Sequence, residues 1–243
     1  MGRTTQHALL FLLGAALLRI AADDTYLRYV RPGHRWLLIG AGAVMVVLAA
    51  VAVLRDVRSS PDAHGHGDGH AHGAVERHVP WLLLAPVLVL ALVAPPALGA
   101  DAVAQGGVSA PASPPAGGVP GLEPLPDGPA TMSVAELVKR AVWERGSMDG
   151  REVVLVGFTV PGEAGGVELA RLSIFCCAAD ARVNVVELTG APATALAALP
   201  PDTWLEVRGT VEPGSAAGRA DVVPTVVVGE ARAVPAPADP YEF

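Results

Sequence analysis

The side chains with the most evident chemistry are histidines gathered in one short stretch of the sequence. Neutral imidazole suits zinc, copper, nickel and cobalt, and glycine between ligands lets the backbone wrap around an ion without side-chain clashes. A solvated low-complexity loop of drifted composition is the alternative. We predict that this loop contacts zinc or another first-row transition metal in capture, buffering or sensing, since a rigid catalytic site needs ligands on ordered elements. The loop spans 61–78, contains HGHGDGHAH, and offers His64, His66, Asp68, His70, His72 and His78.

The chain has two cysteines, Cys176 and Cys177, which are adjacent in the stretch IFCCAADAR. If residues 167–177 form one strand, neighbouring side chains point to opposite faces of the sheet, which disfavours both sulfurs binding one ion. A disulfide between neighbours is strained, because consecutive Cα atoms lie about 3.8 Å apart and the bond prefers about 4.4–6.8 Å. Packing therefore favours one buried and one partly exposed thiol. A metal-ligand or redox role, helped by Asp180, stays open as the alternative.

The sequence carries no recognisable catalytic signature, since it has no phosphate-binding glycine loop, no nucleophile elbow and no His-Glu-x-x-His motif. All seven histidines precede residue 79, so neither cysteine has a histidine in its own domain to act as general base. Cys-x-x-Cys is also absent, which argues against a thiol oxidoreductase. We therefore predict that the protein is not an enzyme.

The part of the chain that must position the histidine loop is dominated by three apolar runs, 7–22, 36–54 and 80–100. A helix needs about 20 apolar residues to span a bilayer core. A chain of this size has no soluble core for runs that are apolar on all faces. Residues 1–100 are therefore predicted to form a membrane domain of three transmembrane helices in contact with lipid.

The first apolar run competes with a signal peptide, but Asp23 and Asp24 directly after it make a poor cleavage site. Extended to Val30, the segment is long enough to span the membrane. Arg19 and Asp23 then lie at i and i+4 on one helical face, where they can neutralise each other within the membrane. Snorkelling of this pair toward the lipid headgroups is the alternative.

The orientation in the membrane depends on positive charge near the ends of the runs. The two loops carry three arginines each, so they cancel. After the third run there is no Lys or Arg until Lys139, and a flank without positive charge favours the outer side. We predict that the N-terminus and the histidine loop are cytoplasmic and that the C-terminal domain is extracytoplasmic.

Beyond the membrane, composition separates a tether from a β domain. Residues 101–130 are dominated by Ala, Gly, Pro and Ser, as is typical of an extended tether. Ser133 and Glu136 form a capping-box pattern, which predicts a helix that ends near Gly146. Five segments rich in β-branched residues follow, with room for a short helix between the third and the fourth. These segments are 151–160, 167–177, 181–190, 203–212 and 222–234.

This order of elements predicts an all-β C-terminal domain over 131–236, an OB-like five-stranded barrel with a leading helix, followed by a tail, 237–243. Gly157 and Gly209 fit bends or bulges that let a short barrel close, and a small β-sandwich is the alternative. Nucleic acid is excluded as a ligand. From residue 130 on, the chain has nine Lys and Arg and fifteen Asp and Glu, which gives a net charge of −6 that would repel a phosphate backbone. The sequence also has no row of aromatic residues on which bases could stack.

The whole chain can be compared with known families. It has two N-terminal spans, a histidine-bearing loop, a third span ending in APPALGA, and then the segments SIFCCAADAR, DTWLEVRGTVE and PADPYEF. This arrangement resembles a bacterial family of predicted permease subunits, long catalogued as domains of unknown function and similar to a two-gene permease system of Bacillus. The most specific part is Cys-Cys-x-Ala-Asp-Ala, residues 176–181. The chain departs from the family at Asp23 and Asp24, which make the end of the first span more acidic.

The resemblance implies a partner, which is a larger polytopic permease subunit, and it implies no established substrate. Combined with the histidine loop, it predicts an accessory subunit of a permease in the bacterial plasma membrane. The permease would serve transport or homeostasis of a divalent transition metal such as zinc, copper or cobalt. The alternative is a stand-alone membrane protein that binds metal as an envelope sensor and transports nothing.

Overall fold

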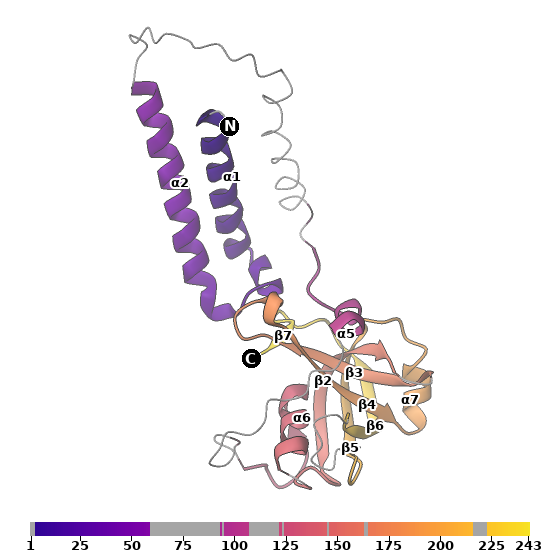
Figure 1. Cartoon of the computed structure of the whole chain (residues 1–243). Coiled ribbons are helices and arrows are strands. Elements are labelled where there is room, and N and C mark those ends of the chain that lie inside the picture. Colours follow the sequence, from indigo (N-terminus) through magenta and orange to yellow (C-terminus); the bar gives the residue numbers. More distant parts are fainter. Residues whose placement is uncertain are drawn as a thin grey trace. The chain divides into compact units, whose positions relative to one another are not determined.

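The computed structural model describes residues 3–58, 93, 95–106, 122, 124–144, 146–162, 165–215 and 223–243. The chain divides into two compact units, Met1–Pro96 and Ala97–Phe243 (Figure 1). The described part of the first unit is helical, and the second unit holds a mixed β sheet with short helices. The predicted histidine loop and most of the third apolar run lie outside the described residues.

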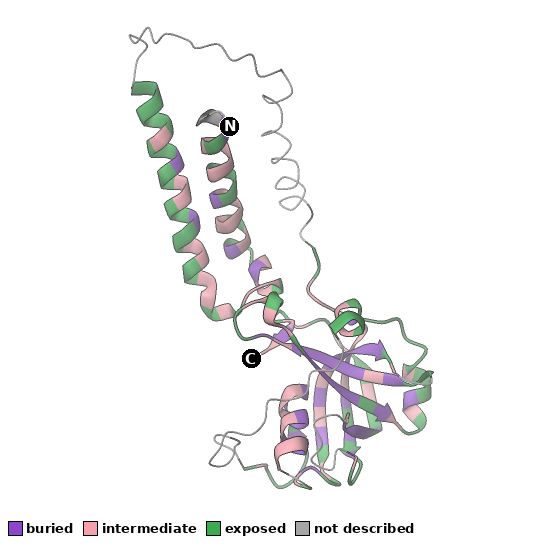
Figure 2. Ribbon diagram, in the orientation of Figure 1, coloured by how far each residue is buried: buried purple, intermediate pink, exposed green. Residues whose placement is uncertain are grey.

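The described part of the first unit contains two long apolar helices joined by a short connection. Both helices are long and apolar enough to cross a membrane, by length and composition. Most side chains of the second helix are exposed within the unit, as expected for a surface that faces lipid or another helix (Figure 2). The elements are α1 Arg3–Ala22, the 3-10 turns η1 Thr25–Arg28 and η2 Pro32–His34, and α2 Arg35–Arg58.

Helices α1 and α2 pack closely where Gly14 faces Gly42. A Cβ atom on Gly14 would lie 2.8 Å from the carbonyl oxygen of Gly42, and a Cβ atom on Gly42 would lie 2.9 Å from the carbonyl oxygen of Gly14. Small residues of this kind let the backbones of membrane helices approach each other. Gly40 differs, because a Cβ atom there would have no neighbour within 4 Å. Gly42 therefore lies at the contact between the two helices, whereas Gly40, two residues earlier, does not.

The end of α1 differs from the prediction. The helix stops at Ala22 and does not continue to Val30. Asp24 adopts a left-handed conformation with φ 59°, and the Asp23 carboxylate accepts the Thr25 N–H at 3.1 Å, so these polar residues close a turn. Arg19 Nε and Asp23 Oδ2 do lie 4.0 Å apart, with both side chains largely exposed. Asp23 therefore pairs with Arg19 from a position beyond the last helical residue.

The described residues of the second unit form seven strands and several short helices. The helix predicted from the capping box is present, and Ser133 Oγ accepts the Glu136 N–H at 3.0 Å. The strands are β1 Ala130–Thr131, β2 Glu152–Pro161, β3 Val167–Ser173, β4 Arg182–Thr189, β5 Trp204–Val211, β6 Thr225–Ala233 and β7 Tyr241–Glu242. The helices are α5 Ala100–Gly106, α6 Val134–Trp143, the 3-10 turn η4 Ala178–Asp180 and α7 Ala191–Leu196.

The strands form one mixed sheet in the order β1-β2-β5-β6-β4-β3-β7, and β2 also pairs with β3. The five longer strands are thus linked in a ring of pairings, in which β4 and β6 are parallel and the other pairs are antiparallel. The sheet has seven strands where five were predicted, because β1 and β7 add parallel pairings at its margins. Two-residue strands show no alternation in the sequence, so they escape a periodicity argument.

A bulge lies beside Gly209 in the pairing of β5 with β6, and its extra residue is Gly229 of β6. The register of β5 against β6 shifts between Arg208 and Gly209. A Cβ atom on Gly209 would lie 2.5 Å from the carbonyl oxygen of Val227, closer than real Cβ contacts. Gly157 in β2 is equally confined, with a Cβ position 2.7 Å from the carbonyl oxygen of Ala170. Glycine is needed at both positions because the neighbouring backbone approaches closely.

The boundary between the two units lies before the predicted tether. Residues 97–106, which were assigned to the third span and the tether, belong to the β unit. Ala100 is buried in a core cluster with Phe158, and its N–H donates to Asp202 Oδ1 at 2.7 Å. The stretch APPALGA resembles the end of a membrane span in sequence, but its residues Ala97, Leu98 and Ala100 pack into the core of the β unit. The remainder of the tether, 107–121, lies outside the described residues.

Candidate metal centre

The cysteine pair lies in a loop and not in a strand. Strand β3 ends at Ser173, Ile174 is buried, and Phe175 is 80% exposed. Cys176 is exposed and Cys177 is half-buried. The predicted strand through residue 177 and the predicted burial of one thiol are therefore wrong. Because the backbone turns here, the argument that neighbouring side chains point to opposite faces does not apply.

Asp180 closes this loop through its carboxylate. Oδ1 accepts the N–H of Phe175 at 2.8 Å, and Oδ2 accepts the N–H groups of Cys176 at 2.8 Å and Cys177 at 3.3 Å. Cys177 is the N-cap of η4, and its sulfur accepts the N–H of Asp180 in return. Aspartate is well suited to this position because its short side chain reaches backbone N–H groups a few residues away. The loop is thus fixed by four hydrogen bonds to two side chains.

The closed loop brings the two sulfur atoms together. The Sγ atoms of Cys176 and Cys177 lie 3.6 Å apart, and one ligand atom from each cysteine and from Asp180 lies within 4.8 Å of the others. Two sulfur atoms bound to one zinc ion at about 2.3 Å in tetrahedral geometry would be about 3.8 Å apart. The observed separation suits a shared ion and is far longer than the S–S bond of a disulfide, about 2.05 Å.

The hydrogen bond between Asp180 and Cys176 shifts the pKa of the carboxylate and of the thiol in opposite directions. The Cys176 thiol and then the backbone N–H groups hydrogen-bond to the Asp180 carboxylate, which lowers its pKa to about 2. The same hydrogen bond to Asp180, followed by that to Cys177, raises the pKa of the Cys176 thiol to about 12. A neutral thiol is a poor nucleophile. The raised pKa therefore disfavours spontaneous redox chemistry at this thiol, and a bound ion would have to displace its proton.

The low pKa of Asp180 predicts how the loop responds to acid. The ionised carboxylate is the form that accepts the three N–H groups, so the loop is intact above the ordinary carboxyl pKa of 3.8 and opens as the pH falls through about 2. We expect the amide NMR resonances of Phe175 and Cys176 to shift together with a midpoint near pH 2. A midpoint at the ordinary value would show that the carboxylate does not hold the loop. In Asp180→Asn this transition should be absent.

The other predicted ligands do not join this centre in the described structure. All six candidates in the histidine loop lie outside the described residues, so that prediction remains a prediction. Among the described residues, Cys176, Cys177 and Asp180 are the one group of three side chains able to hold a metal ion. A contact that the sequence did not predict brings His7 Nδ1 within 3.6 Å of Asp56 Oδ2. This contact could have been expected if the first two apolar runs were assumed to pack as antiparallel helices, because the start of the first helix then lies beside the end of the second.

Comparison with known proteins covers the C-terminal part of the chain. Residues 136–243 match the DUF1980 C-terminal domain family. This range runs from α6 to β7 and includes the three residues of the candidate centre. The match supports the predicted resemblance to an uncharacterised domain family, while the permease assignment is not part of it. No curated protein and no solved structure matches the chain.

Proposed function

We propose that this protein binds a divalent transition metal at Cys176, Cys177 and Asp180 and serves as an accessory subunit of a membrane permease for such ions. The observation that carries the proposal is the pair of sulfur atoms 3.6 Å apart beside a carboxylate on an accessible loop. Thiolate ligands select zinc, copper and related soft or borderline ions over magnesium or calcium. Zinc, copper or cobalt is therefore the ion that we expect.

The ligand set favours transfer of an ion over permanent structural binding. Structural zinc sites are closed by four protein ligands, whereas sites with three protein ligands keep a position for water or an incoming group. The loop offers three ligands, and the Asp180 carboxylate already accepts three N–H groups. Cys176 is exposed, so a second protein can reach the ion. An accessory subunit that receives or delivers an ion needs such an open position.

The membrane part of the proposal comprises three spans, α1, α2 and the third apolar run. Chain geometry supports the third span. Helix α2 has 24 residues, about 36 Å of helix, and ends at Arg58. The carbonyl of Pro95 accepts the Tyr29 hydroxyl at 2.8 Å, and Tyr29 lies in the connection at the other end of the helix pair. Arg58 and Pro95 thus lie at opposite ends of the helix pair, as a third span between them would require.

The remaining parts of the proposal concern the location and the domain type. We place the protein in the bacterial plasma membrane with the C-terminal domain outside, because the flank that precedes Lys139 lacks positive charge. Exposed apolar side chains on α2, such as Trp36 and Leu37, would face lipid or the permease. We also propose that the β unit is an OB-like barrel, supported by the ring of five strand pairings and by α7 between β4 and β5.

The function is tested in cells that carry the chromosomal gene with Cys176→Ser and Cys177→Ser. We expect cellular zinc or cobalt content to change at unchanged protein abundance, and we expect the wild-type chain to co-purify in mild detergent with a multi-span membrane protein. The double variant and the wild type should recover that partner equally, because the two substitutions lie in the β unit. Normal metal content in the variant, at normal abundance, would refute the role of the site in transport.

A second candidate function follows from the same site. A stand-alone envelope sensor would bind metal with the same three ligands and would transport nothing. The two functions differ in the co-purification experiment. Recovery of no multi-span protein, together with altered transcription of metal-responsive genes in the cysteine variant, would favour the sensor.

A further inference from the structure

The last residues of the chain form a docked strand beside the candidate metal centre. Strand β7 pairs in parallel with the end of β3, with Leu172 opposite Tyr241 and Ser173 opposite Glu242. The carbonyl of Glu242 then accepts the N–H of Ile174 at 3.1 Å. Ile174 is the last residue before the loop that Asp180 closes. The C-terminal strand therefore holds the chain at the point where the loop begins.

The register of this strand is fixed by its side chains. Tyr241 is 2% exposed in the core cluster that also contains Leu172 and Ile174, and its hydroxyl accepts the N–H of Leu98 at 3.0 Å. A two-residue strand has too few backbone hydrogen bonds to set its own register. The buried ring of Tyr241 supplies that constraint, because a shift by one residue would exchange its position with that of Glu242.

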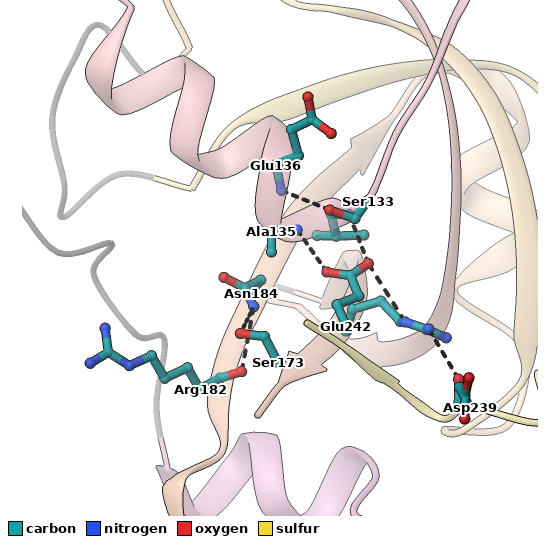
Figure 3. Close-up of polar contacts among 10 residues, drawn as sticks. Ser133, Ala135, Glu136, Ser173, Arg182, Asn184, Asp239 and Glu242 are labelled. Carbon is teal, nitrogen blue, oxygen red and sulfur yellow. Dashed lines mark hydrogen bonds and ion pairs between the residues drawn. The ribbon is translucent and has the colours of Figure 1, made fainter. Parts of the chain in front are cut away.

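Glu242 provides a second anchor through its carboxylate, which points at the first turn of α6 (Figure 3). Its oxygens accept the N–H groups of Val134 and Ala135, both at 2.9 Å, two of the unpaired donors that every helix start presents. Arg171 Nε lies 3.6 Å from Glu242 Oε1, and the Arg171 guanidinium stacks over Trp204 at 4.8 Å. The carboxylate is thus held from α6 on one side and from β3 on the other.

We propose that Glu242 is a positioning residue for the metal centre: by locking β7 between α6 and β3, it sets the start of the loop that carries Cys176 and Cys177. This inference rests on the proposed function. The loop has two fixed ends, Ile174 held by the strand and Asp180 held by its own hydrogen bonds. If the first end shifts, the N–H groups of the loop no longer meet the Asp180 carboxylate, and the two sulfur atoms separate.

The test compares Glu242→Ala with Glu242→Gln in the full chain, purified in detergent, with the histidines of 61–78 replaced by alanine in every sample. Cobalt is the probe, and its sulfur-to-metal charge-transfer absorption reports binding at the cysteines. We expect Glu242→Ala to weaken cobalt binding by about tenfold to a hundredfold, the usual cost of losing a group that orients ligands. Glu242→Gln, which keeps one oxygen acceptor, should recover part of the affinity.

A matched control separates positioning from general loss of stability. Val207 is fully buried in β5, in the core cluster that does not contain Tyr241. Val207→Ala should lower the unfolding temperature without weakening cobalt binding. Equal affinity of Glu242→Ala and the wild type would overturn the inference, and so would an equal loss of affinity in Val207→Ala.

Hydrogen exchange in the metal-free protein keeps this test independent of the proposed function. Glu242→Ala should accelerate exchange of the amides of residues 175–177 by about tenfold or more, because local opening exposes amides that are hydrogen-bonded in the closed loop. Unchanged exchange would overturn the inference. If the wild type binds no cobalt at its cysteines, the proposed function fails, while the exchange result still decides whether Glu242 positions the loop.

Discussion

The double variant Cys176→Ser, Cys177→Ser is expected to lose at least about a hundredfold in affinity for zinc or cobalt at the C-terminal domain. Loss of a group that only orients a ligand costs about tenfold to a hundredfold, so loss of two direct ligands costs more. The hydroxyl of serine stays protonated at neutral pH and does not replace a thiolate as a ligand. The fold should survive, because Cys176 is exposed and serine at position 177 is a good N-cap.

The measurement is a competition titration with a chromophoric chelator on the full chain with alanine at the histidines of 61–78. The matched control is Ala197→Ser, Ala198→Ser, an adjacent and exposed pair after α7. This control should bind metal like the parent protein. Each single cysteine variant should fall between the parent and the double variant. Metal binding of the double variant that equals the control would remove the cysteines from the site.

The substitution Gly209→Ala is expected to destabilise the β unit by about 3 kcal/mol, the upper end of the usual cost of overpacking. A Cβ atom at this position meets the backbone oxygen of Val227 at 2.5 Å and cannot be accommodated by a side-chain rotation. The register shift between β5 and β6 must then move or the pairing of these strands must open. Native-state hydrogen exchange of peptides from β5 and β6 measures this change in the free energy of opening.

Gly229, the extra residue of the bulge in β6, provides the matched control for this prediction, because it has space for a Cβ atom. A Cβ atom there would have the carbonyl oxygen of Arg208 as its nearest neighbour at 3.5 Å, an ordinary van der Waals contact. Gly229→Ala should therefore leave exchange nearly unchanged. If both substitutions had the same small effect, the bulge would not depend on glycine at position 209.

Features with a local signal could be predicted from the sequence. The capping box at Ser133 gives α6, because the hydrogen bond that starts the helix joins residues three apart. An irregular pairing beside Gly209 is indicated by a glycine inside a β-branched segment. The two apolar helices follow from long runs of mostly apolar residues. In each case the residues that decide the structure are close together in the chain.

The loop at the cysteines and the docking of Glu242 could not be predicted in this way. The stretch from Ile174 to Cys177 is apolar and reads as the end of a strand, but Asp180 draws the backbone into a loop. That Asp180 brings the two thiols together can be seen only when the course of this loop is known. Likewise Glu242 lies in a seven-residue tail that carries no periodicity, and its partners are more than a hundred residues away at Val134 and Ala135.

The end of the third apolar run could not be located from the sequence either. Apolar residues 97–100 continue the run in the sequence, and only their burial against the β unit separates them from it. A hydrophobic pattern indicates that a segment leaves water, but it does not tell a bilayer from a protein core when the segment is rich in small residues. The boundary at Ala97 therefore had to come from the structure.

The most direct test of the central claim is the X-ray absorption spectrum of the full chain, with alanine at the histidines of 61–78, loaded with one equivalent of zinc. If Cys176, Cys177 and Asp180 hold the ion, the first shell should contain two sulfur atoms at about 2.3 Å and oxygen at about 2.0–2.2 Å. The sulfur contribution should vanish in Cys176→Ser, Cys177→Ser. A first shell with fewer than two sulfur atoms in the parent protein would contradict the assignment of this loop as a metal site.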